Sequence, residues 1–411
     1  MILDLSKIKI MKKQYLTAFL FLLIFNSNAT YTWQQLTSMP NVGRLGTAGF
    51  AIGNKIYYGL GDNNFNVQFN DLWEYDPSND TWTQKALFPG GARVSTTFFS
   101  LNDYGYFGLG WSSYSGGNAY NSFFKYDAIL NQWFPISNYP GSASFNAIAF
   151  VINGFAYVGC GGPGSGKNFY KYDPLNDIWT FATTFPGSVY QSATAFSVNN
   201  IGYICGGWDG NNVVNDLWAY NPIINIWTQK AGIPIARGSA ISFVFGNKVF
   251  VGTGGLAGNF GGSKDMFEYD YLADSWSIAP IFPGNPLAGL RGTVIGNTGY
   301  GFGGGDASIG YFSSEIWKFS GVTSIEFYTN SHLDPFCYFN NGELYIKDPD
   351  NFKALELYSI SGSKIISALS GAITNKISLE QFNLNSGYYL YNLLDKSGNN
   401  YSGKLFFNCQ L

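Results

Sequence analysis

Short runs in which apolar and polar residues alternate dominate this chain, and turns rich in glycine and asparagine end them. In the first such group, residues 44–52 lead to the turn Gly53-Asn54, and a second run, 55–58, ends in a glycine cluster. A third run, 71–76, leads through a polar turn to a fourth around Trp82. Because successive side chains of a β-strand point to opposite faces, this pattern predicts four antiparallel strands joined as a meander.

The four-run unit recurs along the chain. In five copies a tryptophan follows a tyrosine by seven positions, and successive tryptophans of these pairs lie 46 to 51 positions apart. A sixth copy, around residues 316–319, has no closing tryptophan, whereas Trp33 precedes the first copy without a unit of its own. A fixed period of this length indicates a repeat architecture. We therefore expect the N-terminal strand around Trp33 to complete the sixth unit and close the ring, which removes an exposed sheet edge. The five pairs are Tyr75–Trp82, Tyr126–Trp133, Tyr172–Trp179, Tyr220–Trp227 and Tyr269–Trp276.

Glycine doublets such as Gly206-Gly207, ahead of the spaced tyrosine and tryptophan, resemble those of kelch repeats, whose period is also roughly 50 residues. The resemblance covers about residues 31–322, and we expect the propeller domain to span residues 30–322. It implies an all-β fold, a six-bladed kelch β-propeller closed by an N-terminal strand. Kelch propellers include binding scaffolds, sugar isomerases and oxidases, so the resemblance leaves the function open.

The N-terminal 29 residues have the features of an export signal. The basic stretch Met11-Lys12-Lys13 precedes a short apolar run, 15–25, and then the small residues Ser27-Asn28-Ala29. This order is typical of a signal peptide, here residues 1–29, with Met11 as an alternative start. The apolar run is short for a membrane span, and we expect no transmembrane helix in the mature chain.

After the repeats, residues 323–335 are expected to form a linker and residues 336–411 a small β-sandwich. Within it, the segments 357–362, 379–389 and 403–405 resemble the C-terminal sorting domain of the type IX secretion pathway of Bacteroidetes-type bacteria. The resemblance implies that the type IX secretion machinery is a partner and that the protein is secreted or held at the outer cell surface. An accessory sandwich that binds a ligand is the alternative.

The four cysteines fall into two groups. Cys160 and Cys205 occupy neighbouring repeats at positions too far apart for a disulfide, so we expect two buried free thiols. Cys337 and Cys409 bracket the C-terminal segment, and a disulfide between them is possible in an exported protein.

Composition excludes several kinds of chemistry. Only 12% of residues are charged and the net charge is −3, which predicts no attraction to nucleic acid. The single histidine, His332, lies in the expected linker. The histidine-containing copper site of kelch oxidases, zinc sites and Ser-His-Asp catalysis therefore have no ligands or base in the propeller. We expect no metal and no cofactor.

Polar residues at one recurring position suggest a ligand site. Arg44, Arg93 and Arg237 each precede an equivalent glycine by 15 positions, and Ser144 and Tyr190 stand at the corresponding place; the sixth copy departs and offers Ala288 nearby and Arg291 slightly downstream. We expect these residues to begin the first strand of each blade and to line the central channel. The residues that follow the glycine clusters should share the same channel mouth. They are Asp62, Asp209, Asp306, Trp111 and Trp208.

Arginine, aspartate and tryptophan together suit a carboxylate-bearing or sugar-like ligand. The alternative is that the arginines pair with neighbouring aspartates and loop carbonyls. The leading interpretation is a secreted or cell-surface kelch propeller that binds a glycan, an acidic ligand or an extracellular protein without catalysis. A second is a sugar isomerase resembling the kelch-type sialic-acid mutarotases, which use a channel arginine and a carboxylate. A third is a structural component of adhesion or matrix.

Overall fold

A computed structural model describes residues 30–63, 67–114, 117–162, 164–189, 191–246, 248–256, 261–322, 337–340, 343–346, 348–359, 364–369, 373–374, 376–378 and 387–407. The chain divides between residues 324 and 325 into two compact units. Within the described ranges, no helix is long and apolar enough to cross a membrane. The predicted signal peptide and linker lie outside these ranges.

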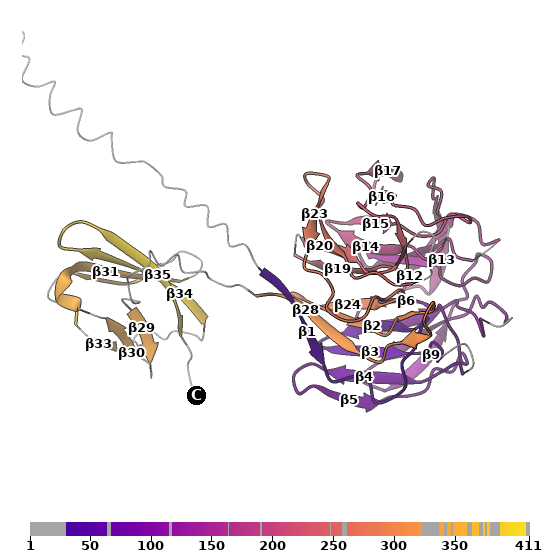
Figure 1. Cartoon of the computed structure of the whole chain (residues 1–411), viewed down its shortest axis with the longest axis horizontal. Helices are drawn as coiled ribbons and strands as arrows, with labels where there is room; N and C mark the ends of the chain where they lie inside the picture. The colour runs from indigo at the N-terminus through magenta and orange to yellow at the C-terminus, as the bar shows by residue number, and fades with distance from the viewer. Residues whose placement is uncertain are drawn as a thin grey trace, which may run out of the picture. The chain divides into compact units, whose positions relative to one another are not determined.

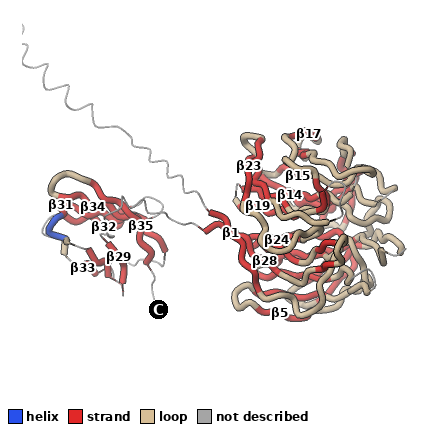
Figure 2. The backbone as a smooth tube through the Cα atoms, in the orientation of Figure 1, coloured by secondary structure: helices blue, strands red, loops and turns tan. Residues whose placement is uncertain are grey.

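The first unit is a six-bladed β-propeller, and each blade is a four-stranded antiparallel sheet (Figures 1 and 2). Every blade follows the predicted meander, from an innermost strand at the channel to an outermost strand at the rim. Blades 1 to 3 are β2 (Ala48–Ile52), β3 (Lys55–Gly59), β4 (Leu72–Asp76), β5 (Thr81–Gln84); β6 (Thr97–Leu101), β7 (Tyr104–Gly108), β8 (Phe123–Asp127), β9 (Gln132–Ile136); and β10 (Ile148–Ile152), β11 (Phe155–Gly159), β12 (Asn168–Asp173), β13 (Ile178–Thr184).

Blades 4 and 5 have the same order, and the loops add short strand pairs. The blades are β14 (Thr194–Val198), β15 (Ile201–Cys205), β16 (Leu217–Asn221), β17 (Ile226–Lys230); and β19 (Ile241–Phe245), β20 (Lys248–Gly252), β22 (Met266–Asp270), β23 (Ser275–Ala279). The added pairs are β18 (Arg237–Gly238) with β21 (Gly255–Leu256), and β26 (Gly305–Asp306) with β27 (Tyr311–Phe312).

The N-terminal strand closes the ring, as the sequence predicted. Blade 6 consists of β24 (Arg291–Ile295), β25 (Thr298–Phe302), β28 (Ile316–Val322) and β1 (Thr30–Leu36), and β1 pairs antiparallel with β28 along its whole length. Trp33 takes the place of the missing sixth tryptophan: its ring lies 4.6 Å from that of Phe319, and its Nε1 donates to the Pro280 carbonyl at 3.2 Å.

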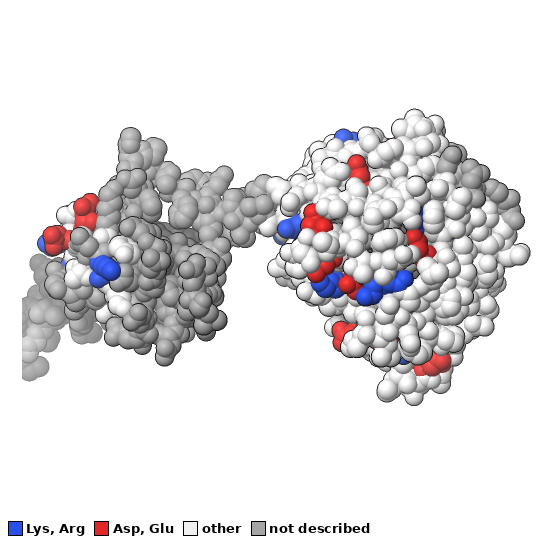
Figure 3. Space-filling view, turned by 90° about the horizontal axis from the view of Figure 1, so that it is seen from below, with Lys and Arg blue, Asp and Glu red and all other residues white. Residues whose placement is uncertain are grey.

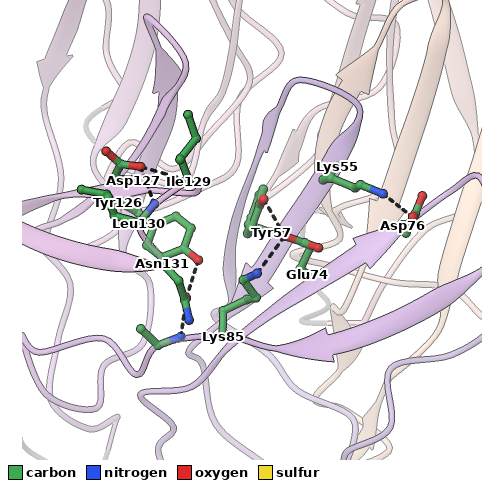
Figure 4. Close-up of polar contacts among 11 residues, drawn as sticks. Lys55, Tyr57, Glu74, Asp76, Lys85, Tyr126, Asp127, Ile129, Leu130 and Asn131 are labelled. Carbon is green, nitrogen blue, oxygen red and sulfur yellow. Dashed lines mark hydrogen bonds and ion pairs between the residues drawn. The ribbon is translucent and has the colours of Figure 1, made fainter.

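The recurring tyrosine and tryptophan pack the core and also join neighbouring blades. At the outer hairpin of blade 2 the Asn131 side-chain oxygen accepts hydrogen bonds from the Tyr126 hydroxyl, at 2.8 Å, and from the Ala86 N–H after blade 1, at 2.9 Å (Figure 4). Trp133 donates in turn to the Ala86 carbonyl at 3.1 Å. Asp80, Asp177 and Asp274 make the corresponding bonds to both a tyrosine and the preceding blade. The repeat residues thus form both the core and the blade-to-blade joints.

The two thiols of the propeller are free and buried, which confirms that prediction. Burial raises the pKa of Cys160 and of Cys205 to about 12, so both stay protonated and unreactive at neutral pH.

The second unit is a seven-stranded β-sandwich by its described strands, as predicted. Its sheets share a core that includes Leu344, Phe352, Leu357 and Leu393. The proposed Cys337–Cys409 disulfide lies outside the described side chains. The two sheets are β29 (Cys337–Asn340), β30 (Glu343–Ile346), β33 (Lys376–Ser378); and β32 (Lys364–Leu369), β31 (Phe352–Ser359), β34 (Gly387–Asp395), β35 (Asn400–Phe407).

Candidate ligand-binding channel

The innermost strands of all six blades surround a central cavity of about 420 Å³. A volume of this size suits a small-molecule ligand. Its lining combines apolar residues with hydroxyl and amide side chains from every blade except the first, and Arg291 is the only charged residue among the described residues that line it. The polar lining residues are Thr96, Thr97, Ser100, Asn146, Ser192, Thr194, Ser197, Ser242, Arg291 and Thr293.

A ring of backbone hydrogen bonds surrounds one end of this cavity, which we call the channel mouth, where the innermost strands begin. Two residues before each of these strands, one residue has a left-handed backbone conformation with φ between +52° and +69°. Its N–H donates to the carbonyl of the equivalent residue one blade earlier, in five links of 2.6 to 3.2 Å. The six residues are Gly46, Ser95, Asn146, Ser192, Ser239 and Gly289.

Arg291 is the first residue of β24 and therefore stands at the channel mouth. The equivalent first residues of the other innermost strands are uncharged. Its Nε donates to the Thr47 carbonyl at 3.2 Å, and its guanidinium lies 5.8 Å from the Phe98 ring centre. Among the described residues Arg291 forms no ion pair, so no carboxylate neutralises its charge. Burial lowers its pKa, but an arginine still keeps its proton at neutral pH.

Tyr114 lies close enough to this arginine to feel its charge, and Tyr114 contacts Ser95. Their hydroxyl oxygens are 2.7 Å apart, and a Cβ on Gly46 would come within 2.4 Å of the Tyr114 hydroxyl oxygen. Burial raises the pKa of Tyr114, while the positive charge of Arg291 acts in the opposite direction and the negative charge of Asp62 adds to the rise. The channel mouth thus combines a cation, a neutral phenol and hydroxyl groups.

The three arginines singled out from the sequence are not among the residues that line the cavity. Arg44 is 0% exposed and holds Asp71 with both terminal nitrogens, at 2.5 and 2.7 Å, while the Phe69 ring centre lies 3.7 Å from its guanidinium carbon. It also donates to the Leu60 carbonyl at 3.3 Å. Its charge is paired inside the protein.

Arg93 and Arg237 have the same kind of surroundings. Arg93 donates to the carbonyls of Gly90 and Leu109 and stacks on Tyr120, with 4.0 Å from its guanidinium carbon to the ring centre. Burial lowers its pKa to about 10. Arg237 donates to the Thr253 carbonyl at 2.8 Å and pairs with Asp265. These bonds tie the entry of a blade to its central strands.

The expected position of the arginines at the start of the first strands is therefore wrong. The innermost strands begin four residues after Arg44, Arg93 and Arg237, and in blade 5 Arg237 belongs to the separate short strand β18. Each arginine reaches the carbonyl sixteen residues later, on Leu60, Leu109 or Thr253, all in the left-handed conformation. The ligand-binding role assigned to these arginines stays a prediction, and their geometry is that of the structural alternative.

The other predicted site residues lie on loops around the channel mouth. Asp62 bridges to Leu45, Trp111 to Val94 and Trp208 to Gln191, so the loops after the second strands do return to this end. Ser144 is 1% exposed, and its hydroxyl accepts the Gly162 N–H at 3.1 Å. Tyr190 lies outside the described residues.

The carboxylates and one indole of these loops are engaged in local contacts. Asp209 accepts the N–H groups of Asn211 and Asn212, and Asp306 accepts the Ser308 N–H at 3.0 Å. Trp111 stacks on Phe145 with ring centres 4.5 Å apart. None of the predicted loop residues lines the cavity.

Sequence reasoning missed Arg291 as the channel residue, although it noted that the sixth copy departs from the pattern. The signal was available in the register: Arg291 pairs with Phe302 as Ala48 pairs with Gly59. An alignment on the second strands would have placed Arg291 at the head of an innermost strand, where the other copies have uncharged residues.

On the face shown in Figure 3 the surface carries no concentrated charge that compares with Arg291 in the channel. The chain has 23 Lys and Arg against 26 Asp and Glu, and on the face shown in Figure 3 the two signs occur in small mixed groups on a mostly uncharged propeller. A charged ligand would therefore be attracted by the local field of the channel rather than by a surface of one sign.

Comparisons with known proteins agree with this fold. Residues 192–232, which cover blade 4, match the Kelch motif family model. No curated protein matches this chain by sequence. The solved structure titled "Structure of YjhT" is similar with a TM-score of 0.60 and 17% identity, over 68% of this chain and 95% of that one. The chain thus has a kelch-type propeller fold, with one recognisable Kelch motif in its fourth blade.

Proposed function

We propose that this protein is an exported kelch propeller that binds a small carboxylate-bearing ligand in its central channel without catalysing a reaction. The observation that carries the proposal is Arg291, a channel cation that makes no ion pair among the described residues. Burying a charge without a counter-ion is costly, and a ligand carboxylate would remove that cost with two charge-assisted hydrogen bonds.

The rest of the lining indicates what else the ligand would carry. Hydroxyl and amide groups such as Thr97, Asn146, Ser192 and Thr194 can donate and accept hydrogen bonds, while neighbouring phenylalanines supply apolar contact. A sugar acid has this combination of one carboxylate, several hydroxyl groups and an apolar ring face. Sialylated and uronic-acid sugars are therefore the first candidates.

Binding can be tested on a glycan array that includes sialylated and uronic-acid sugars, with the mature chain and its Arg291→Gln variant. A specific hit that the variant loses supports the proposal. If no sugar binds, or if both proteins bind equally, the proposal is overturned. An extracellular protein partner or a structural role would then be favoured.

A sugar isomerase like the kelch-type sialic-acid mutarotases is the second candidate, because a channel arginine is what that resemblance implied. Such an enzyme also needs a carboxylate near the sugar, and the described lining residues include none. Asp62 is the carboxylate that acts on Tyr114, and it is 0% exposed. Exchange of anomers of a bound sugar, followed by NMR, would favour this candidate if Asp62→Asn stops it while binding persists.

Export belongs to the same proposal. The predicted signal peptide at residues 1–29 and the resemblance of segments within residues 336–411 to type IX sorting domains support secretion to the outer cell surface. Removing residues 336–411 should leave the propeller inside the cell envelope, which fractionation of the producing cells would show. Unchanged secretion of the shortened chain would contradict it.

A further inference from the structure

One blade has an outer edge that differs from the others. In every blade the outermost strand is paired on one side only, so a row of its backbone N–H and C=O groups has no strand partner. Such edges can pair with another chain unless lysine, proline or polar side chains discourage it. The edge strand of blade 3, β13, has no lysine and no proline over residues 178–181, and Thr180 is its one polar side chain there.

The other five edges each carry a protection. A lysine directly follows β5, and β17 ends with one. The strand β9 contains a proline, and a proline directly follows β23. The strand β1 exposes threonine and glutamine instead of large apolar side chains. In blade 1 the lysine is held in place, since Lys85 pairs with Glu74 at 3.3 Å (Figure 4). The residues concerned are Lys85, Lys230, Pro135, Pro280, Thr32, Gln34 and Gln35.

By contrast, β13 is long and uncharged, and it exposes two large apolar side chains. It has seven residues, Ile178–Thr184, against four or five in the outermost strands of blades 1, 2, 4 and 5. Ile178 is 52% exposed and Phe181 is 59% exposed, and Leu175 in the preceding turn is 89% exposed. The fold does not require an apolar residue there, because Gln84 occupies the position of Phe181 in blade 1.

The regular part of the edge ends at a bulge. Ile178 to Phe181 pair in unbroken register with β12, after which the register shifts and Ala182 is left without a partner on β12. A bulge bends a strand and limits how far pairing can extend. A short segment around Thr180 is therefore the part of the edge that is open to addition.

We propose that β13 is a homotypic docking edge, at which a second copy of this chain adds its own β13 in antiparallel orientation. Charge favours this occupant: residues 178–184 contain no charged side chain, so two copies meet without repulsion. If Thr180 lies opposite Thr180 of the second copy, Trp179 lies opposite Phe181 of that copy. By the twofold symmetry of the dimer, Phe181 then lies opposite Trp179 of the second copy. Cross-strand aromatic pairs of this kind stabilise an antiparallel ladder.

The result is an eight-stranded sheet that runs through blade 3 of both copies, since each contributes the four strands β10 to β13. The contact is isologous, so it closes at a dimer and does not extend into a filament. It lies at the outer rim, at the opposite edge of the sheet from the channel strand β10, and is independent of the proposed ligand binding.

The test is the association state of the mature full chain, measured by sedimentation over concentrations from about 1 μM to about 500 μM. We expect a reversible monomer–dimer equilibrium. Thr180→Lys places a lysine opposite its own copy and should weaken the dimer by at least about tenfold. The matched control, Thr83→Lys, sits in the same register on β5 and should associate like the parent protein.

A charge exchange separates repulsion at the edge from misfolding. Thr180→Lys and Thr180→Glu should each dimerise more weakly than the parent protein, whereas an equal mixture of the two should associate more tightly than either alone, because lysine then faces glutamate. Circular dichroism confirms that each variant is folded. A parent protein that stays monomeric throughout, a Thr180→Lys variant that dimerises unchanged, or a mixture that fails to associate each overturns the proposal.

Discussion

Arginines occupy two different kinds of surroundings at the same end of this propeller. Arg44 lies between blade elements, sealed from solvent and paired with Asp71. Arg291 lies four residues further along its own repeat, in the wall of the channel, with one hydrogen bond to a carbonyl and no ion pair among the described residues. An arginine thus stabilises the fold where a carboxylate of the protein pairs with it, and it is available to a ligand where no such carboxylate is present.

The largest difference between the two should appear in stability. Arg44→Met leaves the Asp71 carboxylate buried without its cation, which we expect to cost about 3–5 kcal/mol of unfolding free energy. Urea denaturation of the propeller measures this loss. A cost below about 1 kcal/mol would show that solvent or another residue compensates Asp71, and the structural reading of this arginine would fail.

The converse change should affect ligand affinity and leave stability alone. Arg291→Gln removes a charge that makes no internal ion pair, so the unfolding free energy should not fall by more than about 1 kcal/mol. Affinity for a carboxylate ligand should fall by about 10- to 100-fold, as expected for losing hydrogen bonds to a charged group. Calorimetric titration measures the affinity. A variant that unfolds as readily as Arg44→Met would place Arg291 with the structural arginines.

Replacing both members of the buried pair should recover much of what the single change loses. In Arg44→Met combined with Asp71→Leu no unpaired charge remains, and the double variant should lie within about 1–2 kcal/mol of the parent. The Trp73 indole, which donates to Asp71 at 2.9 Å, would lose its acceptor and accounts for part of the remainder. The same denaturation series measures the coupling, and strictly additive costs would contradict an ion pair.

The smallest expected effect concerns pH. The described channel lining contains no aspartate, glutamate or histidine, so the affinity for a carboxylate ligand should stay constant between about pH 5 and 8. Burial lowers the pKa of Arg291; affinity is therefore lost on the alkaline side, as rising pH removes the arginine proton. Affinity titrations from about pH 5 into the alkaline range check both expectations. An acidic limb near pH 5 would reveal a carboxylate at the site and favour the isomerase reading.

Local sequence decided most of the architecture. Alternation with period two, glycine and asparagine turns, and the tyrosine–tryptophan spacing determine the four-stranded blade, and the orphan Trp33 determines how the ring closes. These features are predictable because a strand pair or a tight turn depends on residues close together in the chain. The same reasoning placed Asp62, Trp111 and Trp208 at one mouth, since hairpin topology alone puts them there.

Only the tertiary structure decided which polar groups are sealed and which face the channel. Arg44 lies in a buried ion pair, only four positions before the first residue of the innermost strand β2. Between the arginine position and the strand each blade has a residue with a left-handed backbone, and this residue is a serine or asparagine in four of the six blades. Whether a charge is paired depends on Asp71, a residue 27 positions away. Whether two residues so far apart in the chain meet is decided only when the ring has assembled. Burial and charge pairing are therefore properties of the assembled ring and not of the single repeat.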